Sequence, residues 1–183
     1  MFIHEMFQQK PCVFSVEVFP PKKAGAAEET LYPVLRELCT LGPDYISVTY
    51  GAGGGTAGQS TAKIASYIKN GLHVEALAHL TCVNSTRVQV EETLTRLRED
   101  NVENVLALRG DINPDLPRRM DFLHASDLAK AIAQTGGFGV AGACYPEGHV
   151  ESPSLKADVE SLRYKAEAGV SHLITQLFFD NVS

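Results

Sequence analysis

Glu17 is the residue whose surroundings most clearly suit it to chemistry. It lies inside the apolar run Val13–Phe19, and strand alternation would place it on the same face as Val13, Ser15 and Phe19. A carboxyl group surrounded by apolar side chains is desolvated, which favours its protonated form and suits it to act as a general acid near neutral pH. The alternative is an edge-strand glutamate that faces water, as most glutamates do.

A second candidate site follows the apolar run Asn104–Leu108, where Arg109, Gly110 and Asp111 stand in succession. A buried Arg109 would bind a phosphate or a flavin edge, and Asp111 would orient a heterocycle through its ring nitrogens. The alternative is a surface ion pair between Arg109 and Asp111, which would contribute little to stability.

Other apolar runs also end in polar side chains. These are Thr49 and Tyr50, then His79 and Thr81, then Tyr145 to His149, and finally Thr175 and Gln176. If the runs are parallel strands, their carboxyl ends meet at one end of the sheet. We therefore expect these side chains, together with Glu17, Arg109 and Asp111, to border one site.

The glycine-rich stretch 51–58 admits a nucleotide-binding interpretation. Gly53, Gly55 and Gly58 have the spacing of the dinucleotide fingerprint and follow a predicted strand. That strand is the second rather than the first, however, and the acidic residue at a suitable distance, Glu75, begins the next strand instead of ending it. There is no Gly-Lys-Ser/Thr sequence, which excludes a P-loop. We interpret the stretch as a loop that borders a site.

The histidines and cysteines do not have the spacing of a metal site. His79 and His149 lack a His or Cys partner at ligand spacing, so we expect them to stack on a ligand or hydrogen-bond to it. The four cysteines are far apart and form no C-x-x-C pair, which indicates reduced thiols in a cytoplasmic protein: Cys12, Cys39, Cys82 and Cys144.

The elements that would position these residues recur at a regular interval. Apolar runs begin at positions 12, 45, 74, 104, 139 and 172, and segments with helical spacing lie between them. This period is typical of repeated βαβ units and predicts a parallel sheet. The predicted strands are Cys12–Phe19, Tyr45–Thr49, Val74–Leu80, Asn104–Leu108, Gly139–Ala143 and His172–Gln176.

Two α/β architectures fit this alternation. An open doubly wound sheet agrees with the count of six units, because a closed (β/α)8 barrel takes about 250 residues. An open sheet, however, binds ligands at one crevice, whereas a barrel gathers residues from the ends of many strands. The polar residues at all six strand ends favour a TIM barrel, of which about six of eight β/α units are present. We expect a single, incomplete domain over residues 1–183.

Composition restricts the partners. The 183 residues carry 16 basic and 22 acidic side chains, a formal net charge of −6, and 44% of them are hydrophobic. These values are ordinary for a globular domain. The acidic balance argues against a nucleic-acid partner, and no apolar run is long enough to span a membrane. A small molecule is the partner that we expect.

Seven motifs in order resemble the methylenetetrahydrofolate reductase family, and in particular its bacterial-type catalytic domain. They are FSVEVFPPK, ISVTYGAGGGT, AHLTCVNST, NVLALRGD, ASDL, YPEGH and ITQLFFDN, and they extend from about Val13 to Asn181. The resemblance implies a flavoprotein oxidoreductase of one-carbon and methionine metabolism, built as a (β/α)8 barrel with FAD at the carboxyl ends of the strands.

The resemblance also implies a ping-pong reaction, in which NADH or NADPH reduces FAD and leaves. Methylenetetrahydrofolate then takes its place and is reduced to 5-methyltetrahydrofolate. By the same resemblance Glu17 is the general acid that opens the five-membered ring of the folate, and Asp111 is a carboxylate that favours the cationic intermediate. Thr49 and Gln176 would contact nicotinamide and folate in turn.

The FAD-binding residues are also implied by the resemblance alone. Three of them, Asp158, Ser161 and Lys165, have the spacing of one helix face. The full set is Tyr50, Ala52, His79, Arg109, Gly110, Asp111, Ala125, Tyr145, His149, Ser152, Asp158, Ser161, Tyr164 and Lys165.

The sequence stops after the sixth predicted strand, whereas the family has eight. Either the chain is truncated or it completes itself by association, and we expect a homo-oligomer because an open arc exposes apolar edges. One alternative function is a non-catalytic flavin- or nucleotide-binding module. Another is a lyase or aldolase that uses Glu17 without flavin, but this would need a Schiff-base lysine at a strand end, and none is found.

Overall fold

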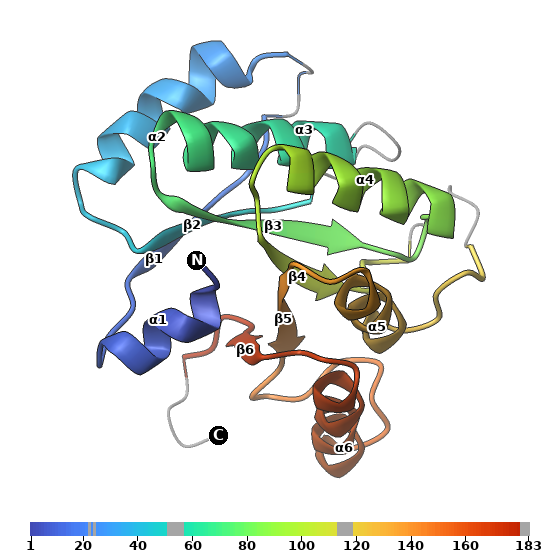
Figure 1. Cartoon of the computed structure of the whole chain (residues 1–183). Coiled ribbons are helices and arrows are strands. Elements are labelled where there is room, and N and C mark those ends of the chain that lie inside the picture. Colours follow the sequence, from blue (N-terminus) through green and yellow to red (C-terminus); the bar gives the residue numbers. More distant parts are fainter. Residues whose placement is uncertain (22, 24, 51–56, 113–118, 180–183) are drawn as a thin grey trace.

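A computed structural model of the chain describes residues 1–21, 23, 25–50, 57–112 and 119–179. Six parallel strands form one sheet in the order β1-β2-β3-β4-β5-β6 (Figure 1). The bounds of each strand differ from those of its predicted run by a few residues at most. The strands are β1 Ser15–Val18, β2 Tyr45–Val48, β3 Glu75–Thr81, β4 Asn104–Leu108, β5 Gly139–Cys144 and β6 His172–Thr175.

Helices connect the strands on the outer side of the sheet. All five connections contain an α-helix, and two of them also contain one turn of π-helix (η1 and η3). A helix was expected after the glycine-rich stretch, and α3 confirms it, whereas the π-helical turns were not predicted. In chain order the helical elements are α1 Ile3–Gln9, η1 Ala27–Leu31, α2 Tyr32–Cys39, α3 Ala57–Ser66, η3 Tyr67–Gly71, α4 Arg87–Glu99, α5 Ala125–Thr135 and α6 Leu155–Glu167.

The order of the strands distinguishes the two architectures that the sequence left open. A doubly wound sheet reverses its strand order near the middle, whereas successive strands of a barrel are neighbours all the way round. Each strand here pairs in parallel with the next one in the chain, from Ser15 opposite Tyr45 to Ala141 opposite His172. The described residues thus form an open arc of a barrel with six parallel strands and five connecting helical segments, and the predicted fold class is confirmed.

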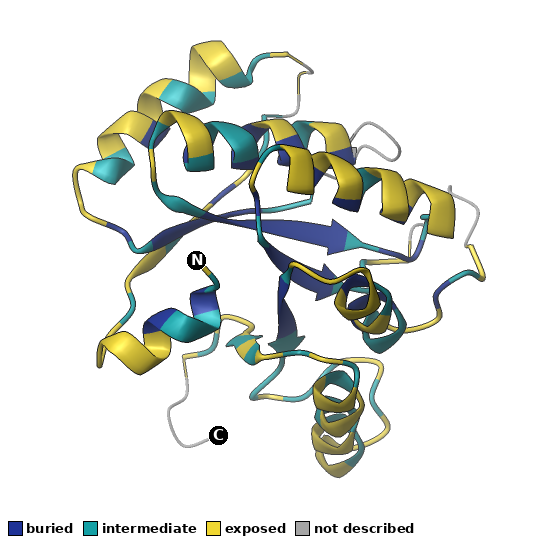
Figure 2. Ribbon diagram, in the orientation of Figure 1, coloured by how far each residue is buried: buried dark blue, intermediate teal, exposed yellow. Residues whose placement is uncertain are grey.

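The main core lies between the sheet and its covering helices. Period-two alternation turns Ile46 of β2 and Val105 of β4 outward, where they are fully buried. Leu35 of α2, Leu94 of α4 and Ile132 of α5 belong to the same cluster and are buried to the same degree. Figure 2 shows the result as a dark band of central strands beneath helices that are buried on one side only.

A smaller core lies on the inner side of the arc, beneath α1, a helix that the sequence analysis missed. Ile3 and Met6 of α1 pack against Leu77 and Leu106, which face inward from β3 and β4. The buried side chain of Asn104, the first residue of β4, accepts a hydrogen bond from the backbone N–H of Ile3 at 2.9 Å. The helix therefore packs against the amino-terminal ends of the strands, opposite the end where the sequence predicts the site.

The outer strands are less covered than the central ones. In β1 and β6 exposed residues alternate with less exposed ones, and α6 has no buried residue. Several large apolar side chains of these end regions reach solvent: Phe14, Phe19, Leu173, Leu177 and Phe179. Within the described part of the chain no helix is long and apolar enough to cross a membrane.

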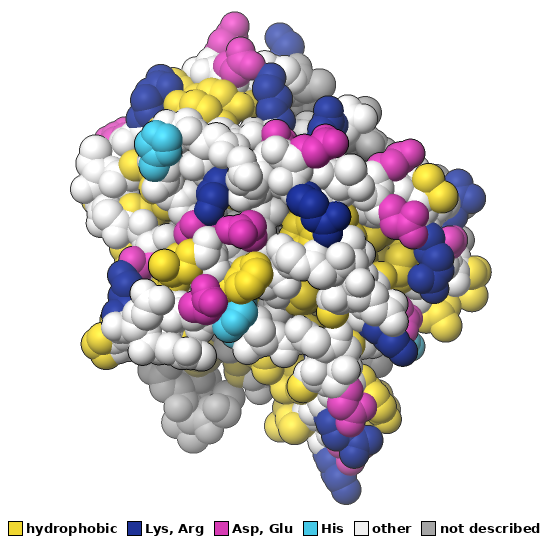
Figure 3. Space-filling view, in the orientation of Figure 1, with side chains coloured by type: hydrophobic (Ala, Val, Ile, Leu, Met, Phe, Trp, Pro, Cys, Tyr) yellow, Lys and Arg dark blue, Asp and Glu magenta, His cyan; other side chains and the backbone are white. Residues whose placement is uncertain are grey.

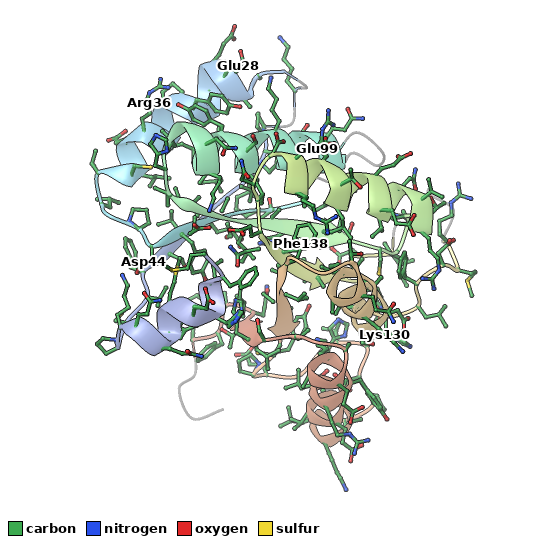
Figure 4. The ribbon with its side chains drawn as sticks, viewed as in Figure 1. Glu28, Arg36, Asp44, Glu99, Lys130 and Phe138 are labelled. Atoms are coloured by element: carbon green, nitrogen blue, oxygen red, sulfur yellow. The ribbon has the colours of Figure 1, made fainter. Side chains whose placement is uncertain are left out.

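Aromatic and polar contacts join the helical layer to the loops. Phe138, labelled in Figure 4, precedes β5, and the guanidinium carbon of Arg98 in α4 lies 5.4 Å from the centre of its ring. Asp44, also labelled, precedes β2 and pairs with Lys10 after α1. The same carboxylate accepts a hydrogen bond from the backbone N–H of Phe14 at 2.8 Å. Asp44 thus ties α1 and the start of β1 to β2.

Candidate active site at the carboxyl ends of the strands

One large cavity, of about 1680 Å³, opens at the carboxyl ends of the central strands. Its floor comes from the last residues of β2 to β5 and the residues that follow them, such as Thr49, Thr81 and Arg109. Its walls come from α4, α5 and α6 and from the loop between β5 and α6. This is the end of the arc at which barrels of this type gather their active sites.

The residues that the resemblance assigns to the cofactor converge on this cavity. Ala52 lies outside the described residues. All the others line the cavity: Tyr50, His79, Arg109, Gly110, Asp111, Ala125, Tyr145, His149, Ser152, Asp158, Ser161, Tyr164 and Lys165. They come from six segments of the chain, which the parallel sheet brings to one end: the ends of β2, β3 and β4, then α5, the loop after β5, and α6.

The residues predicted to act on the substrate are divided. Thr49 and Asp111 line the cavity, whereas Glu17 and Gln176 do not. The latter two belong to the outer strands: Glu17 lies in β1, and Gln176 directly follows β6. The backbone N–H of Gln176 still donates to the carbonyl oxygen of Cys144 at 2.8 Å, so its main chain continues the pairing with β5.

The expected desolvation of Glu17 is wrong for this arc. Its side chain is 47% exposed, and its neighbours Ser15 and Phe19 on the same face are exposed as well. The physical reason is the position of β1, which pairs with β2 along one edge and has no partner along the other edge among the described residues. Alternation placed Glu17 on the expected face, but that face is covered too little to exclude water.

Two side chains from neighbouring strands meet the carboxylate of Glu17. Ser47 of β2, directly opposite in the register, donates its hydroxyl to Oε2 at 3.2 Å. Nε2 of His79 in β3 lies 3.5 Å from the same oxygen. Burial lowers the pKa of His79 to about 4, so the imidazole is neutral at pH 7 and this contact is not an ion pair. Within the described part of the chain, Nε2 of His79 has no hydrogen-bond partner.

Arg109 pairs with a residue that the sequence analysis did not single out. Its terminal nitrogens donate to the two carboxylate oxygens of Glu151, Nη1 at 2.5 Å and Nη2 at 2.9 Å. This hydrogen-bonded pair raises the pKa of the guanidinium above its ordinary value, and Asp111 adds a smaller electrostatic effect in the same direction. The side chain of Arg109 is 21% exposed. The alternative of a mutual Arg109–Asp111 ion pair is therefore not what the structure shows.

Gly110 allows the backbone to pass close to β3. Its φ of +85° lies in the left-handed region, and a Cβ at this position would lie 3.0 Å from Cβ of Thr81. A side chain would therefore be strained by both the backbone conformation and the contact. The glycine lets Arg109 and Asp111 leave the sheet directly above the end of β3.

The loop after β5 forms a structured wall. The rings of Tyr145 and His149 meet edge to face with centres 4.7 Å apart. The backbone N–H of His149 donates to the carboxylate of Asp158 in α6 at 3.0 Å. Nζ of Lys165 donates to the carbonyl oxygen of Ala143 at 2.5 Å, and burial lowers the pKa of this lysine. The predicted face of α6 thus does line the cavity, and two of its charged groups also hold the wall in place.

Other cavity residues carried no local signal in the sequence. Gln59 of α3, Asn84 after β3 and Lys130 of α5 line the cavity, but each is a single polar residue in or beside a helix and has no diagnostic spacing. Gly58 also lines the cavity and lies beside the ring of Tyr50, whereas Gly53 and Gly55 lie outside the described residues. Among the described residues, no three His, Cys, Asp or Glu side chains come together in a group that could hold a metal ion.

Comparison of the fold with solved structures gives neighbours at low sequence identity. The 2,3-dimethylmalate lyase of the PEP mutase/isocitrate lyase superfamily matches with a TM-score of 0.63 at 12% identity, over 96% of this chain and 63% of that one. A protein from Clostridium thermocellum that binds two copies of 5-methyl-5,6,7,8-tetrahydrofolic acid matches with a TM-score of 0.64 at 12% identity, over 98% and 59%. At these identities the matches show a shared fold and nothing further.

Sequence comparison is more specific. The chain is 39% identical to the 5,10-methylenetetrahydrofolate reductase of Pectobacterium carotovorum, over 91% of this chain and 54% of that protein. It is 36% identical to the Escherichia coli protein of the same name, over 91% and 55%. It is also 35% identical to methylenetetrahydrofolate reductase (NADH) 1 of Arabidopsis thaliana, over 97% and 32%.

The chain spans about half the length of the bacterial relatives that it matches. The family match itself extends over nearly the whole chain, from residue 2 to residue 183. It includes all six described strands, the helices between them and the cavity at the carboxyl ends of the strands. The chain therefore belongs to the methylenetetrahydrofolate reductase family.

Proposed function

We propose that the cavity binds FAD and serves the reduction of 5,10-methylenetetrahydrofolate to 5-methyltetrahydrofolate, with NADH or NADPH as hydride donor. The observation that carries the proposal is the convergence of the residues that the family motifs assign to the cofactor. Thirteen of these residues, which extend from Tyr50 to Lys165 along the chain, border one cavity.

The described residues fit a flavin dinucleotide. The cavity of about 1680 Å³ exceeds the roughly 300–1,000 Å³ of ordinary small-ligand pockets. Nε2 of His79 is buried without a hydrogen-bond partner in the described part of the chain, and such an atom gains from a ligand that can pair with it. Arg109 provides a permanent positive charge for an anionic group. Tyr145 and His149 offer ring surfaces for a flat heterocycle.

Bound FAD would supply the two-electron chemistry, accepting a hydride from the nicotinamide nucleotide and returning one to the folate. The protein residues would position the reactants and move the proton. Glu17 would protonate the folate nitrogen that leaves the one-carbon unit when the five-membered ring opens. Asp111, at the floor of the cavity, would stabilise the positive charge that this opening creates. Thr49 and Gln176 would contact the two substrates in turn.

Ser47 and His79 would assist Glu17 without touching substrate. The hydroxyl of Ser47 donates to the carboxylate, and the neutral imidazole of His79 lies on the same oxygen. Both side chains come from buried strands and are themselves buried. The hydroxyl of Ser47 would hold one oxygen of the exposed carboxylate and leave the other for a proton transfer, and the neutral His79 would add no competing charge.

Flavin release and two half-reactions test the proposal. The purified protein should be yellow and should release FAD on acid precipitation. Anaerobic addition of NADH or NADPH should bleach the flavin, and the better donor identifies the nucleotide preference. Added methylenetetrahydrofolate should then restore the colour. Bleaching without restoration would identify a flavin-binding module that performs one half-reaction, and absence of any flavin would contradict the proposal.

Glu17→Gln separates the two half-reactions. The variant keeps the shape and the contact with Ser47 but cannot donate a proton as an acid. We expect bleaching by NADH to be retained and the rate of reoxidation by folate to fall by about 100-fold, the order that a general acid contributes. Equal losses in both half-reactions would contradict the role of Glu17.

The exposed apolar edges support a second, separate part of the proposal. Phe14 beside β1 and Leu173 in β6 are 44% and 43% exposed, and exposed strand edges favour pairing with another chain. We therefore also propose a homo-oligomer in the cytoplasm. Light scattering coupled to size-exclusion chromatography should give a mass of at least twice 19.8 kDa.

A further inference from the structure

The pairing of Arg109 with Glu151 has a consequence for any anionic ligand of the cavity. Arg109 directly follows β4, and Glu151 lies 42 residues later in the loop between β5 and α6. Both terminal nitrogens of the guanidinium donate to the carboxylate, at 2.5 and 2.9 Å. Two parallel hydrogen bonds of this kind are the geometry in which arginine also binds a phosphate.

The remaining donors of Arg109 do not form a second complete edge. A guanidinium group has five N–H donors and presents them in pairs along its edges. The edge that carries Nη1 and Nη2 is occupied by Glu151, and Nε donates to the carbonyl oxygen of Gly110 at 3.2 Å. The edge that contains Nε therefore has only one donor left. A phosphate can form two parallel bonds to Arg109 only after Glu151 has moved.

The loop presents Glu151 to Arg109 in a structured way. The backbone N–H of Glu151 donates to Nδ1 of His149 at 3.1 Å, and the backbone N–H of His149 is held by Asp158 at 3.0 Å. The side chain of Glu151 is 49% exposed, whereas that of Arg109 is 21% exposed. The carboxylate is thus the more exposed partner of the pair.

Electrostatic repulsion also requires Glu151 to move before a phosphate can bind to Arg109. Glu151, Asp111 and Asp158 all line the cavity with Arg109. An incoming phosphate would be repelled by a carboxylate that stays on the guanidinium, because like charges a few ångströms apart in a partly buried site repel strongly. Movement of Glu151 into solvent removes both the repulsion and the competition for the two donors.

We propose that Glu151 is an internal competitor that occupies the anion-binding edge of Arg109 and is displaced by the phosphate group of the ligand. Glu151 then sets the affinity of the cavity for phosphate-bearing ligands. The inference deepens the proposed function. It rests on that function in one respect, because the displacing group is then the pyrophosphate of FAD.

The test compares Glu151→Gln with a matched variant of the same loop, Glu147→Gln. Glu147 is exposed and does not line the cavity, so the matched variant removes the same charge without touching Arg109. Two probes are titrated by calorimetry, inorganic pyrophosphate and FAD. The dissociation constant of each should fall by about two- to fivefold in Glu151→Gln, the factor that a partly exposed charge pair contributes. Glu147→Gln should bind both probes like the wild type.

The two probes separate this inference from the proposed function. Tighter pyrophosphate binding in Glu151→Gln supports the inference even if FAD does not bind to any of the three proteins, a result that would instead contradict the flavoprotein proposal. FAD that binds equally well to Glu151→Gln and to the wild type overturns the inference and leaves the flavoprotein proposal intact. Weaker binding of both probes in Glu151→Gln, or no binding of either probe to any of the three proteins, also overturns it.

A second variant distinguishes competition from a role of Glu151 in orienting Arg109. Glu151→Ala removes both hydrogen bonds between this side chain and the guanidinium, whereas Glu151→Gln can keep one of them. A competitor predicts that both variants bind pyrophosphate more tightly than the wild type. An orienting residue predicts weaker binding in Glu151→Ala, and that outcome would overturn the inference.

Discussion

The central strands and the outer strands of the same sheet differ in how completely they are covered. Ile46 of β2 and Leu77 of β3 are fully buried, whereas Leu173 of β6 is 43% exposed. Composition contributes to the difference, because half of the residues in β1 and in β6 are polar, against one of four in β2. A central strand has a hydrogen-bonded neighbour on each side and a helix above it, whereas β1 and β6 each pair along one edge.

The difference in burial between central and outer strands also affects the candidate site. Side chains at the ends of β2, β3 and β4, such as Thr49, His79 and Arg109, line the cavity. The two predicted substrate residues that do not line it, Glu17 and Gln176, belong to β1 and the end of β6. The described residues that we propose for flavin binding thus come from well-packed strands and from α5, α6 and the loop between β5 and α6, whereas two of the four proposed substrate residues come from the exposed outer strands.

The largest expected effect tests the packing difference itself. Ile46→Ala removes a fully buried side chain of the main core and should lower the free energy of unfolding by about 2 to 5 kcal/mol. Leu173→Ala removes a side chain that is already 43% exposed, and should cost about 1 kcal/mol or less. Urea unfolding followed by circular dichroism measures both values. Equal losses would show that β6 is covered in solution, for example by a second copy of the chain.

The sequence predicted the central strands and the residues at their ends correctly. Parallel strands that are buried on both faces are continuous apolar runs, so the predicted run Asn104–Leu108 coincides with β4. The polar residues that end these runs reach one cavity because parallel strands share an end. Local pattern was sufficient in these cases, because each residue's environment is set by its own strand and the two beside it.

The errors lie where the environment depends on distant segments. The α1 helix has only seven residues, too few to show a helical period, and it is held by Asn104 from 101 positions away. Glu151 pairs with Arg109 across 42 positions, and no local spacing announces that contact. The exposure of Glu17 depends on what covers β1, which alternation within β1 cannot show. Long-range contacts of this kind are what a single sequence leaves undetermined.

The pH dependence of the free energy of unfolding should show a smaller effect. It tests whether one residue of an outer strand is an exception to the difference in burial. Burial lowers the pKa of His79 in β3 to about 4, and burial together with His4 lowers the pKa of His172 in β6 to about 4 as well. An outer strand thus contains a half-buried histidine, because α1 lies against this part of β6. The ring of Phe7 in α1 lies 5.7 Å from the ring of His172.

The sign of the effect follows from proton binding. Between pH 6.5 and pH 4 the unfolded chain binds a proton at each of these histidines that the folded chain does not bind. The free energy of unfolding therefore falls as the pH falls through this window, by about 1.4 kcal/mol for each unit of pKa shift, and the full stability is present above about pH 6.5. His79→Gln and His172→Gln should each flatten the curve measured by urea unfolding at pH 7, 6 and 5.

The control is His73→Asn, at an exposed position with a φ of 57°, a left-handed conformation that asparagine tolerates. It removes one histidine and keeps the backbone conformation. If His172→Gln leaves the curve as steep as this control does while His79→Gln flattens it, α1 does not cover β6 in solution and the comparison between central and outer strands holds without exception.

The smallest expected effect comes from two lysine–glutamate pairs at different depths. Nζ of Lys69 lies 2.5 Å from the carboxylate of Glu75 at the start of β3, and the two side chains are only 19% and 17% exposed. Nζ of Lys63 in α3 lies 2.7 Å from Glu28, which Figure 4 labels at the outer edge of the helical layer, and these side chains are 63% and 62% exposed. Charged side chains of both signs are interspersed over the face seen in Figure 3.

The two pairs should respond differently to loss of the lysine charge. Lys69→Gln leaves a mostly buried carboxylate with one charged partner fewer and should lower the free energy of unfolding by about 1 to 2 kcal/mol. Lys63→Gln should leave the urea midpoint unchanged within error, because solvent screens an exposed pair and either side chain is hydrated when alone. Repeating both measurements in 1 M NaCl should leave the cost of Lys69→Gln largely intact. If Lys63→Gln lowered the free energy of unfolding as much as Lys69→Gln, the outer helical layer would be more deeply covered than the structure of the single chain shows. Burial in the central strands would then not be what distinguishes the two regions.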